Sequence, residues 1–143
     1  MSHRFQRFFL VLLLAAGTLT VSAQTTGFKA IRPQGSGAAS SAGMLANGTL
    51  YVSGQGSSAK DFSGQMNDAM RKVRAVLQEA GMDYPNVVWM NIYLTDEHNV
   101  PAMEDAYWNT IGPAPPARTV LTVAALPNGE MVEINCKIGR AHV

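Results

Sequence analysis

Residues 87–95 (VVWMNIYLT) decide the fold, because apolar and polar side chains alternate along them. A period of two residues predicts a β-strand that packs one face against a core. The apolar face holds Val88, Met90, Ile92 and Leu94. The opposite face holds Trp89, Asn91, Tyr93 and Thr95. A face that is part aromatic and part polar suits a subunit interface better than open water.

Helical patterns flank this strand on both sides. Residues 63–80 repeat apolar side chains at spacings of three and four, which predicts a helix with one buried stripe that ends at Gly81. The stripe comprises Met66, Ala69, Met70, Val73, Val76, Leu77 and Ala80. Asn99 is the predicted N-cap of a second helix, with Pro101 in its first turn, which runs to about Thr110.

The remaining strands are shorter and are bounded by turn residues. Asn47-Gly48 predicts a hairpin turn between a weak strand at 43–45 and a β-prone run at 49–53. Strands are also predicted at 119–125 and 131–137, joined by a turn at 127–129. The order strand, strand, helix, strand, helix, strand, strand predicts an α+β domain. Its two helices are expected to cover one face of a mostly antiparallel sheet.

The first 23 residues have the three regions of a secretory signal peptide. A basic start with Arg4 and Arg7 precedes an apolar run at 8–16, and small residues follow at Val21 and Ala23. The apolar run is shorter than the roughly 18 residues that a membrane span needs. We therefore expect cleavage after Ala23 and an exported protein, periplasmic or secreted, with no membrane anchor in its mature form.

The segments on either side of the folded part have their own character. Residues 24–43 are rich in Gly, Ser and Ala and predict an irregular N-terminal arm, followed by the folded domain at 44–137. Residues 138–143 (IGRAHV) match the translation of a common sequencing adapter. We expect this six-residue tail to be non-native.

Composition bears on the classes of partner that the mature chain can have. Removal of the signal peptide leaves nine basic and ten acidic side chains, a net charge of −1, without a run of like charges. A nucleic-acid surface needs an excess of Lys and Arg on one face, so no nucleic-acid partner is predicted. His3, His98 and His142 lack the spacing of metal ligands, and no metal site is predicted. Cys136, the single cysteine, alternates onto an apolar strand face and predicts a buried structural thiol.

Arg118 is a lone charged residue in the stretch 115–123 (PPARTVLTV). A buried guanidinium without a partner is unfavourable, so either a carboxylate of the fold pairs with it or it binds an anion. Glu133 interrupts another apolar strand and is one candidate partner. If the last two strands form a hairpin, however, the register places Arg118 near Ile138, several residues from Glu133. Both interpretations of Arg118 stay open at this point.

Short stretches spread over residues 31–137 resemble the RidA/YjgF family of imine deaminases. They are 50–55 (LYVSGQ), 79–81 (EAG), 87–96, 116–118 (PAR), 126–127 (LP) and 132–134 (VEI). The resemblance implies a chorismate-mutase-like α+β fold and a barrel-like homotrimer with clefts between subunits. It implies a hydrolase acting on C–N bonds, which converts reactive enamines and imines such as 2-aminoacrylate to 2-oxo acids and ammonia. No metal or organic cofactor is implied.

The resemblance also implies roles for particular residues. Arg118 would hold the substrate carboxylate with its planar fork, and Glu133 would orient or activate the attacking water. Ser53 and Gly54 would line the substrate cleft, and the backbone amide of Val120 would add a hydrogen bond to the bound acid.

Two positions depart from the family pattern. Ser40 stands where the deaminases usually have a tyrosine, and Glu104 stands where an asparagine often lies three residues before Tyr107. A carboxylate at Glu104 would repel an anionic substrate unless it is protonated or turned away. An alternative function is therefore a non-catalytic binding protein for small carboxylates with the same fold. Ribonuclease activity is a third hypothesis, and an acidic exported chain fits it poorly.

Overall fold

The structure is a computed structural model that describes residues 27–32 and 40–139. Its strands are β1 (Phe28–Ile31), β2 (Gly43–Ala46), β3 (Thr49–Gly56), β4 (Val87–Leu94), β5 (Ala117–Thr122) and β6 (Val132–Ile138). Its two α-helices are α1 (Phe62–Glu79) and α2 (Val100–Ile111). The predicted signal peptide lies outside the described residues, as do 33–39 of the arm and 140–143 of the tail.

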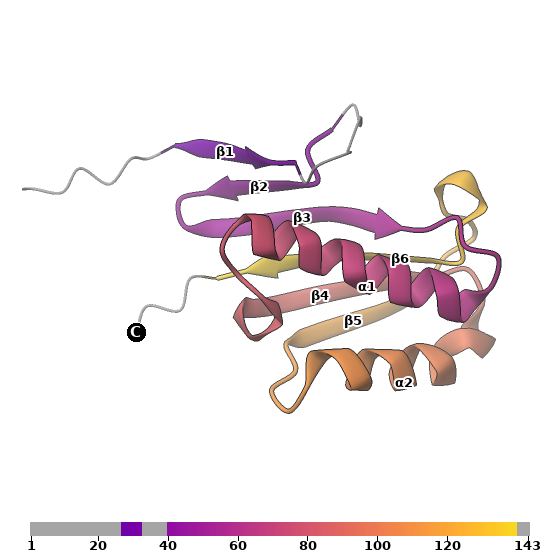
Figure 1. The fold of residues 1–143 in the computed structure, drawn as a ribbon. Helices are drawn as coiled ribbons and strands as arrows, with labels where there is room; N and C mark the ends of the chain where they lie inside the picture. Colours follow the sequence, from indigo (N-terminus) through magenta and orange to yellow (C-terminus); the bar gives the residue numbers. More distant parts are fainter. Residues whose placement is uncertain (1–26, 33–39, 140–143) are drawn as a thin grey trace, which may run out of the picture.

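The strands form one sheet in the order β1-β2-β3-β6-β4-β5, and both helices lie on the same side of it (Figure 1). Neighbouring strands in the described residues are antiparallel except for β4 and β5, which are parallel. The predicted α+β architecture with a mostly antiparallel sheet is confirmed. Its core lies between the sheet and the helices, where side chains such as Leu50, Met66, Leu77, Met90 and Ile134 are fully buried.

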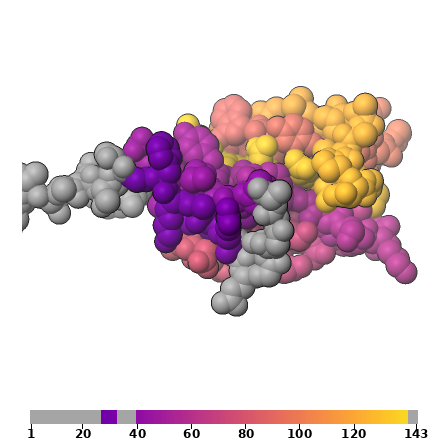
Figure 2. All heavy atoms as spheres, turned by 90° about the horizontal axis from the view of Figure 1, so that it is seen from above, coloured from indigo at the N-terminus to yellow at the C-terminus, as the bar shows by residue number. Residues whose placement is uncertain are grey.

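The β2–β3 hairpin forms where Asn47-Gly48 predicts it. Asn47 has φ of 50° and Gly48 has φ of 79°, as a two-residue turn of the I′ type requires. The predicted irregular arm is wrong in one part, because residues 28–31 form strand β1 on the outer edge of β2. Figure 2 looks onto that end of the sheet and shows β1 in front. Its side chains are exposed except for Ile31, so the chain carries little periodic signal there.

Helix α1 begins and ends one residue earlier than predicted and buries the expected apolar stripe except for Ala80, its C-cap, which is partly buried. The Asp61 side chain caps it by accepting a hydrogen bond from the backbone amide of Gly64 at 2.7 Å. Gln65 is buried and connects two loops, since it donates to the Ala59 carbonyl and accepts from the Met131 amide at 2.7 Å. Helix α2 starts after Asn99 as predicted, although the Asn99 side chain makes no capping hydrogen bond.

Strand β4 is confirmed, with one error in the predicted faces. Met90, Ile92 and Leu94 are fully buried, but Val88 is 49% exposed and Val87 is buried in its place. The pairing with β6 shifts register between Val87 and Trp89, and this irregularity moves one residue of the strand to the other face.

The predicted hairpin between the last two strands is wrong. Strand β6 enters between β3 and β4 and is antiparallel to both, while β5 pairs with β4 alone. The reason is the crossover through α2, because a strand that follows a helix crossover returns parallel to the strand before it. Strand β5 is therefore at the edge of the sheet. The predicted register, in which Arg118 lies opposite Ile138, does not occur. Arg118 instead lies beside Met90.

The face of the sheet away from the helices carries large side chains. Tyr51, Trp89 and Leu121 are 48%, 45% and 47% exposed there. Some polar side chains of this face form hydrogen bonds with one another. The Trp89 side chain donates to Asn91 at 2.8 Å, and the Asn91 side chain donates to Asn135 at 2.9 Å. The aromatic and polar composition predicted for this face is thus present, and its role as a subunit interface stays a prediction.

Two further predictions concern β6 and its end. Cys136 is buried as predicted, and burial raises the pKa of its thiol to about 12. Ile138, assigned to the suspected tail, is the last residue of β6 and is fully buried between Leu50 and Val87 in the pairing register. Within the described part of the chain, neither helix is long and apolar enough to cross a membrane.

Candidate functional site

Arg118 forms an ion pair with Glu104. Nitrogen Nη2 of Arg118 lies 2.6 Å from Glu104 Oε1, and Nη1 lies 3.0 Å from Oε2. Both carboxylate oxygens therefore accept hydrogen bonds from the two ends of the guanidinium fork, which is the strongest arrangement for such a pair. The Arg118 and Glu104 side chains are 21% and 33% exposed. A carboxylate of the fold thus supplies the partner of Arg118, and it is Glu104 rather than Glu133.

Strand β5 and helix α2 position this pair. Arg118 neighbours the buried Met90 across the β4–β5 ladder, so its side chain lies on the helix side of the sheet. Glu104 and Tyr107 are three residues apart on α2 and therefore share one helix face. The local fold places a basic residue of the sheet edge directly beneath an acidic residue of the covering helix.

The guanidinium of Arg118 also contacts buried groups of α2. Its central carbon lies 4.3 Å from the centroid of the Tyr107 ring, within cation–π distance. The sulfur of Met103 lies 4.0 Å from Nη1. Burial raises the pKa of the Tyr107 phenol, and its hydroxyl oxygen has no hydrogen-bond partner among the described residues.

Glu133 lies on the other side of the sheet. It neighbours Tyr93 across the β4–β6 ladder, and the next residue along that row is the exposed Leu121 of β5. Its carboxylate lies over Gly54 of β3, so closely that a Cβ on Gly54 would overlap Glu133 Oε1. Because glycine has no side chain, it leaves room for the Glu133 carboxylate to lie above β3.

Ser53 and Gly54 lie where β3 changes register against β6, between Val52 and Gln55. The hydroxyl of Ser53 donates to the Ser41 carbonyl at 2.9 Å. The structure therefore brings two predicted site residues, Gly54 and Glu133, into contact. Ser53 directly precedes Gly54 in the chain.

A second carboxylate, which sequence reasoning missed, lies beside Glu133. Glu130 covers Gly56 as Glu133 covers Gly54, because a Cβ on Gly56 would overlap its carboxylate. Burial and the charge of Glu133 raise the pKa of Glu130. The one sequence signal for this arrangement is the pair of alternating glycines in β3, which leaves room for two acidic side chains.

The predicted site residues thus form two groups. Arg118 and Val120 lie on β5 and face the helices, whereas Gly54 and Glu133 lie on β3 and β6 near the opposite face. Strand β4 separates β6, which carries Glu133, from β5, which carries Arg118, and this corresponds to about 10 Å at the usual strand spacing. The β5 residue in the row of Glu133 is Leu121, three residues along the strand from Arg118 and on the opposite face. One chain therefore does not bring Arg118 to Glu133. Among residues 27–32 and 40–139, His, Cys, Asp and Glu form no cluster that could hold a metal ion.

Comparison with known proteins places this geometry in a family. The sequence profile described as endoribonuclease L-PSP matches residues 30–138, which includes both groups of candidate residues. The chain is 34% identical over 100 residues to the 2-iminobutanoate/2-iminopropanoate deaminase of Capra hircus, covering 64% of this chain and 72% of that protein. It is 37% identical over 75 residues to protein DfrA of Myxococcus xanthus, covering 52% of this chain and only 57% of that protein's length.

Solved structures agree with this assignment. A Rid-family protein of unknown function, YyfA from Yersinia pestis, superposes with a TM-score of 0.73 at 29% identity and covers 80% of this chain and all of that one. A putative endoribonuclease L-PSP from Entamoeba histolytica gives a TM-score of 0.74 at 27% identity, with 80% and 100% coverage. The match of the profile to most of the chain and these superpositions agree on one conclusion: the chain belongs to the RidA/YjgF family.

Proposed function

We propose that this protein hydrolyses reactive enamines and imines of the 2-aminoacrylate type to 2-oxo acids and ammonia. The observation that carries the proposal is the state of Arg118, which already holds a carboxylate with both ends of its fork. The same geometry suits the carboxylate of an imino acid. Relatives about one-third identical are named as deaminases of such imines, which supports the reaction class.

The proposed chemistry uses only water and side chains of the protein. An enamine first gains a proton on carbon and loses one from nitrogen, which converts it to the imine. Glu133 then accepts a proton as the oxygen of water bonds to the imine carbon, and the nitrogen is protonated. In the resulting carbinolamine the hydroxyl proton passes to nitrogen, the C–N bond breaks as the C=O bond forms, and ammonia leaves. Water is consumed and ammonia is released, so the reaction balances without an oxidant or a reductant.

The proposal requires a second copy of the chain, because Arg118 and Glu133 lie on opposite sides of one sheet. Strand β5 is an edge strand, and the face that carries Glu133 exposes Tyr51, Trp89 and Leu121. We infer a homotrimer in which Arg118 of one copy meets Glu133 of the next across the interface. Closed rings of identical subunits form such sites repeatedly and symmetrically.

The test is release of ammonia and pyruvate from enzymatically generated 2-aminoacrylate, with the spontaneous rate subtracted. Arg118→Lys should lower kcat/KM at least tenfold, because a lysine cannot bind a carboxylate with a planar fork. Glu133→Gln should lower kcat most, because an amide is a poor proton acceptor. Arg74→Lys is the matched control, since Arg74 binds the Asp83 carboxylate with a similar fork and lies on the other helix, α1. Acceleration that survives in both site variants would refute the proposal.

A non-catalytic role in binding small carboxylates is the second candidate. The observation that favours it is Glu104, which occupies the fork of Arg118 and would oppose turnover of an anionic substrate. A folded protein that binds small carboxylates through Arg118 without accelerating imine hydrolysis would fit this candidate.

The family profile's description names an endoribonuclease, and the charges of this chain support that activity poorly. The mature chain has a net charge of −1, and three of its arginines, Arg71, Arg74 and Arg118, already lie in ion pairs with carboxylates of the same chain. Binding to an RNA backbone needs basic side chains that are available to phosphates.

We also propose that the protein is exported, on the basis of its first 23 residues. Expression of the full chain in a bacterium with two membranes should yield a periplasmic protein whose first residue is Gln24. N-terminal sequencing of the fractionated protein checks this, and a cytoplasmic protein that retains the leader would contradict it.

A further inference from the structure

The Glu104 carboxylate occupies the guanidinium fork of Arg118 in this structure. Each carboxylate oxygen of Glu104 accepts a hydrogen bond from a different nitrogen of Arg118, at 2.6 and 3.0 Å. Any ligand carboxylate that takes this fork must therefore displace the Glu104 carboxylate. Within the described residues, Arg118 is the cation in ion-pair contact with Glu104.

Displacement would move Glu104 rather than Arg118. The guanidinium is also held by two buried side chains of α2, the Tyr107 ring at 4.3 Å and the Met103 sulfur at 4.0 Å. Glu104 is the more exposed partner, at 33% against 21%, and lies on the outer layer of the fold. Rotation of the Glu104 side chain is thus the small movement that opens the fork.

The charge of the entering ligand then decides the outcome. A simple anionic acid restores the partner of Arg118 but leaves the partly buried Glu104 carboxylate without its cation, which is unfavourable. A ligand with a positively charged nitrogen beside its carboxylate supplies both partners at once. Because Arg118 and Glu104 start in direct contact, a small rotation of Glu104 keeps its carboxylate near the fork, where it can accept from a nitrogen beside the ligand carboxylate.

We propose that Glu104 is a specificity-determining residue that makes this site select carboxylic acids with a cationic nitrogen over simple anionic acids. The ligand carboxylate binds Arg118, and the ligand nitrogen donates hydrogen bonds to the displaced Glu104 carboxylate. The proposal rests on the proposed use of Arg118 as the carboxylate-binding group. It concerns binding, and it holds whether or not the bound acid is hydrolysed.

The test compares two unreactive ligands of the same carbon skeleton by isothermal titration calorimetry at pH 7. These are L-alanine, which carries an ammonium group, and propionate, which does not. The wild-type protein should bind alanine about tenfold or more tightly than propionate, the range expected for one charge-assisted hydrogen bond. Glu104→Gln should reduce that ratio about tenfold, since it weakens alanine binding and frees Arg118 for propionate.

Controls separate charge from structure. Asp105→Asn removes a neighbouring exposed carboxylate of the same helix and should leave the ratio unchanged. Glu104→Asp keeps the charge, should keep the preference for alanine, and tests the proposal even if Glu104→Gln does not fold. Equal affinities in the wild-type protein, no binding of either ligand, or an unchanged ratio in Glu104→Gln would each overturn the inference.

Turnover distinguishes this inference from the proposed function. A preference for alanine that depends on Glu104, in a protein without deaminase activity, would sustain the inference and refute the proposed function. Deaminase activity in a protein whose ligand preference ignores Glu104 would do the reverse.

Discussion

At the scale of residues, the two parts of the Tyr107 side chain behave differently. Its ring makes a cation–π contact with Arg118, 4.3 Å from the guanidinium carbon, whereas its buried hydroxyl group lacks a hydrogen-bond partner among the described residues. A buried polar group without a partner is destabilising, whereas its aromatic ring stabilises the neighbouring cation. The two effects can be separated by removing the hydroxyl alone.

Tyr107→Phe should raise the free energy of unfolding by about 1 kcal/mol, because it removes an unsatisfied hydroxyl and keeps the ring. Tyr84→Phe is the matched control with the opposite sign. The hydroxyl of Tyr84 is also buried but donates to the Met70 carbonyl at 2.6 Å, so its loss should destabilise the protein by about 1 kcal/mol. Urea unfolding measures both changes, and destabilisation by Tyr107→Phe would show that its hydroxyl is satisfied.

A substitution at Gly54 tests whether activity depends on the position of the Glu133 carboxylate, without changing Glu133 itself. Gly54→Ala introduces a Cβ that overlaps the Glu133 carboxylate, and the backbone φ of Gly54 is one that alanine accepts. The carboxylate should swing away, so kcat should fall about tenfold or more while stability changes by about 1 kcal/mol or less. Gly56→Ala is the control, because on the same strand it displaces Glu130 instead. Equal loss of activity in both variants would contradict the role of Glu133.

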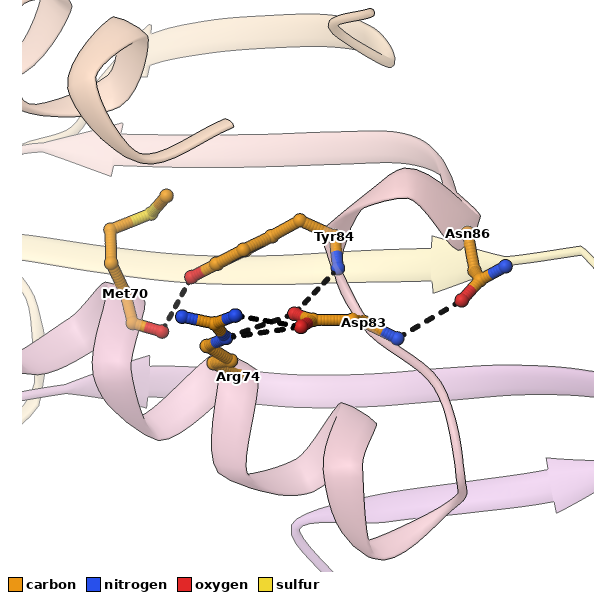
Figure 3. Close-up of polar contacts among 5 residues, drawn as sticks. All are labelled: Met70, Arg74, Asp83, Tyr84 and Asn86. Carbon is orange, nitrogen blue, oxygen red and sulfur yellow. Dashed lines mark hydrogen bonds and ion pairs between the residues drawn. The ribbon is translucent and has the colours of Figure 1, made fainter. Parts of the chain in front are cut away.

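At the scale of elements, the loop after α1 is held by a group of polar contacts (Figure 3). Arg74 of α1 donates to both oxygens of Asp83, at 3.0 and 2.7 Å, and the Asp83 side chain accepts from the amide of Tyr84 at 2.8 Å. The Asp83 amide in turn donates to Asn86 at 3.0 Å. These contacts fix the turn that brings the chain from α1 into β4.

The same contacts make stability depend on pH. The hydrogen bond from Arg74 lowers the pKa of the Asp83 carboxyl below its ordinary value of 3.8. Its stabilising contribution is thus present above that value and is lost as the pH falls through the lower pKa of the folded state. Asp83→Asn should be less stable than the wild type at pH 7, and the difference should vanish towards pH 2. A difference that stays constant in acid, measured by urea unfolding, would contradict this, and Asp105→Asn is the control.

How far the sequence predicts each element depends on whether its signal is local. The stripe of α1 and the buried Met90, Ile92 and Leu94 of β4 follow from periodicity, because each faces a continuous core. Strand β1 has one buried residue, Ile31, and therefore no apolar periodicity that predicts it. Its backbone is held in the sheet by pairing with β2. The insertion of β6 between β3 and β4 is a long-range event that neighbouring residues do not encode.

The site shows the same division. Arg118 and Glu133 were predicted from a lone charge in each strand and from the family resemblance. The pairing of Arg118 with Glu104 was not predicted, because the two residues lie on a strand and a helix that only tertiary packing brings together. The departure at Glu104 from the family pattern was nevertheless a signal that the surroundings of Arg118 are altered in this chain.

At the scale of the whole molecule, the exposed sheet face predicts self-association. Leu121 is 47% exposed on the edge strand β5, at the end of a row with Tyr93 and Glu133. Light scattering on the purified protein should give three times the mass of the mature chain. Leu121→Asp should shift it towards the monomer, because an unpaired charge in an interface opposes association. Asp105→Asn on α2, away from this face, should leave the mass unchanged, and a monomeric wild type would contradict the trimer.

Mixed assemblies of two inactive variants test the central claim most directly. Arg118→Ala and Glu133→Gln should each lack deaminase activity alone. Equal amounts, unfolded and refolded together, should recover about a quarter of the wild-type rate, since random closed trimers leave one site in four with both groups intact. That recovery would show that Arg118 of one copy acts with Glu133 of another. No recovery in verified mixed trimers would contradict the account.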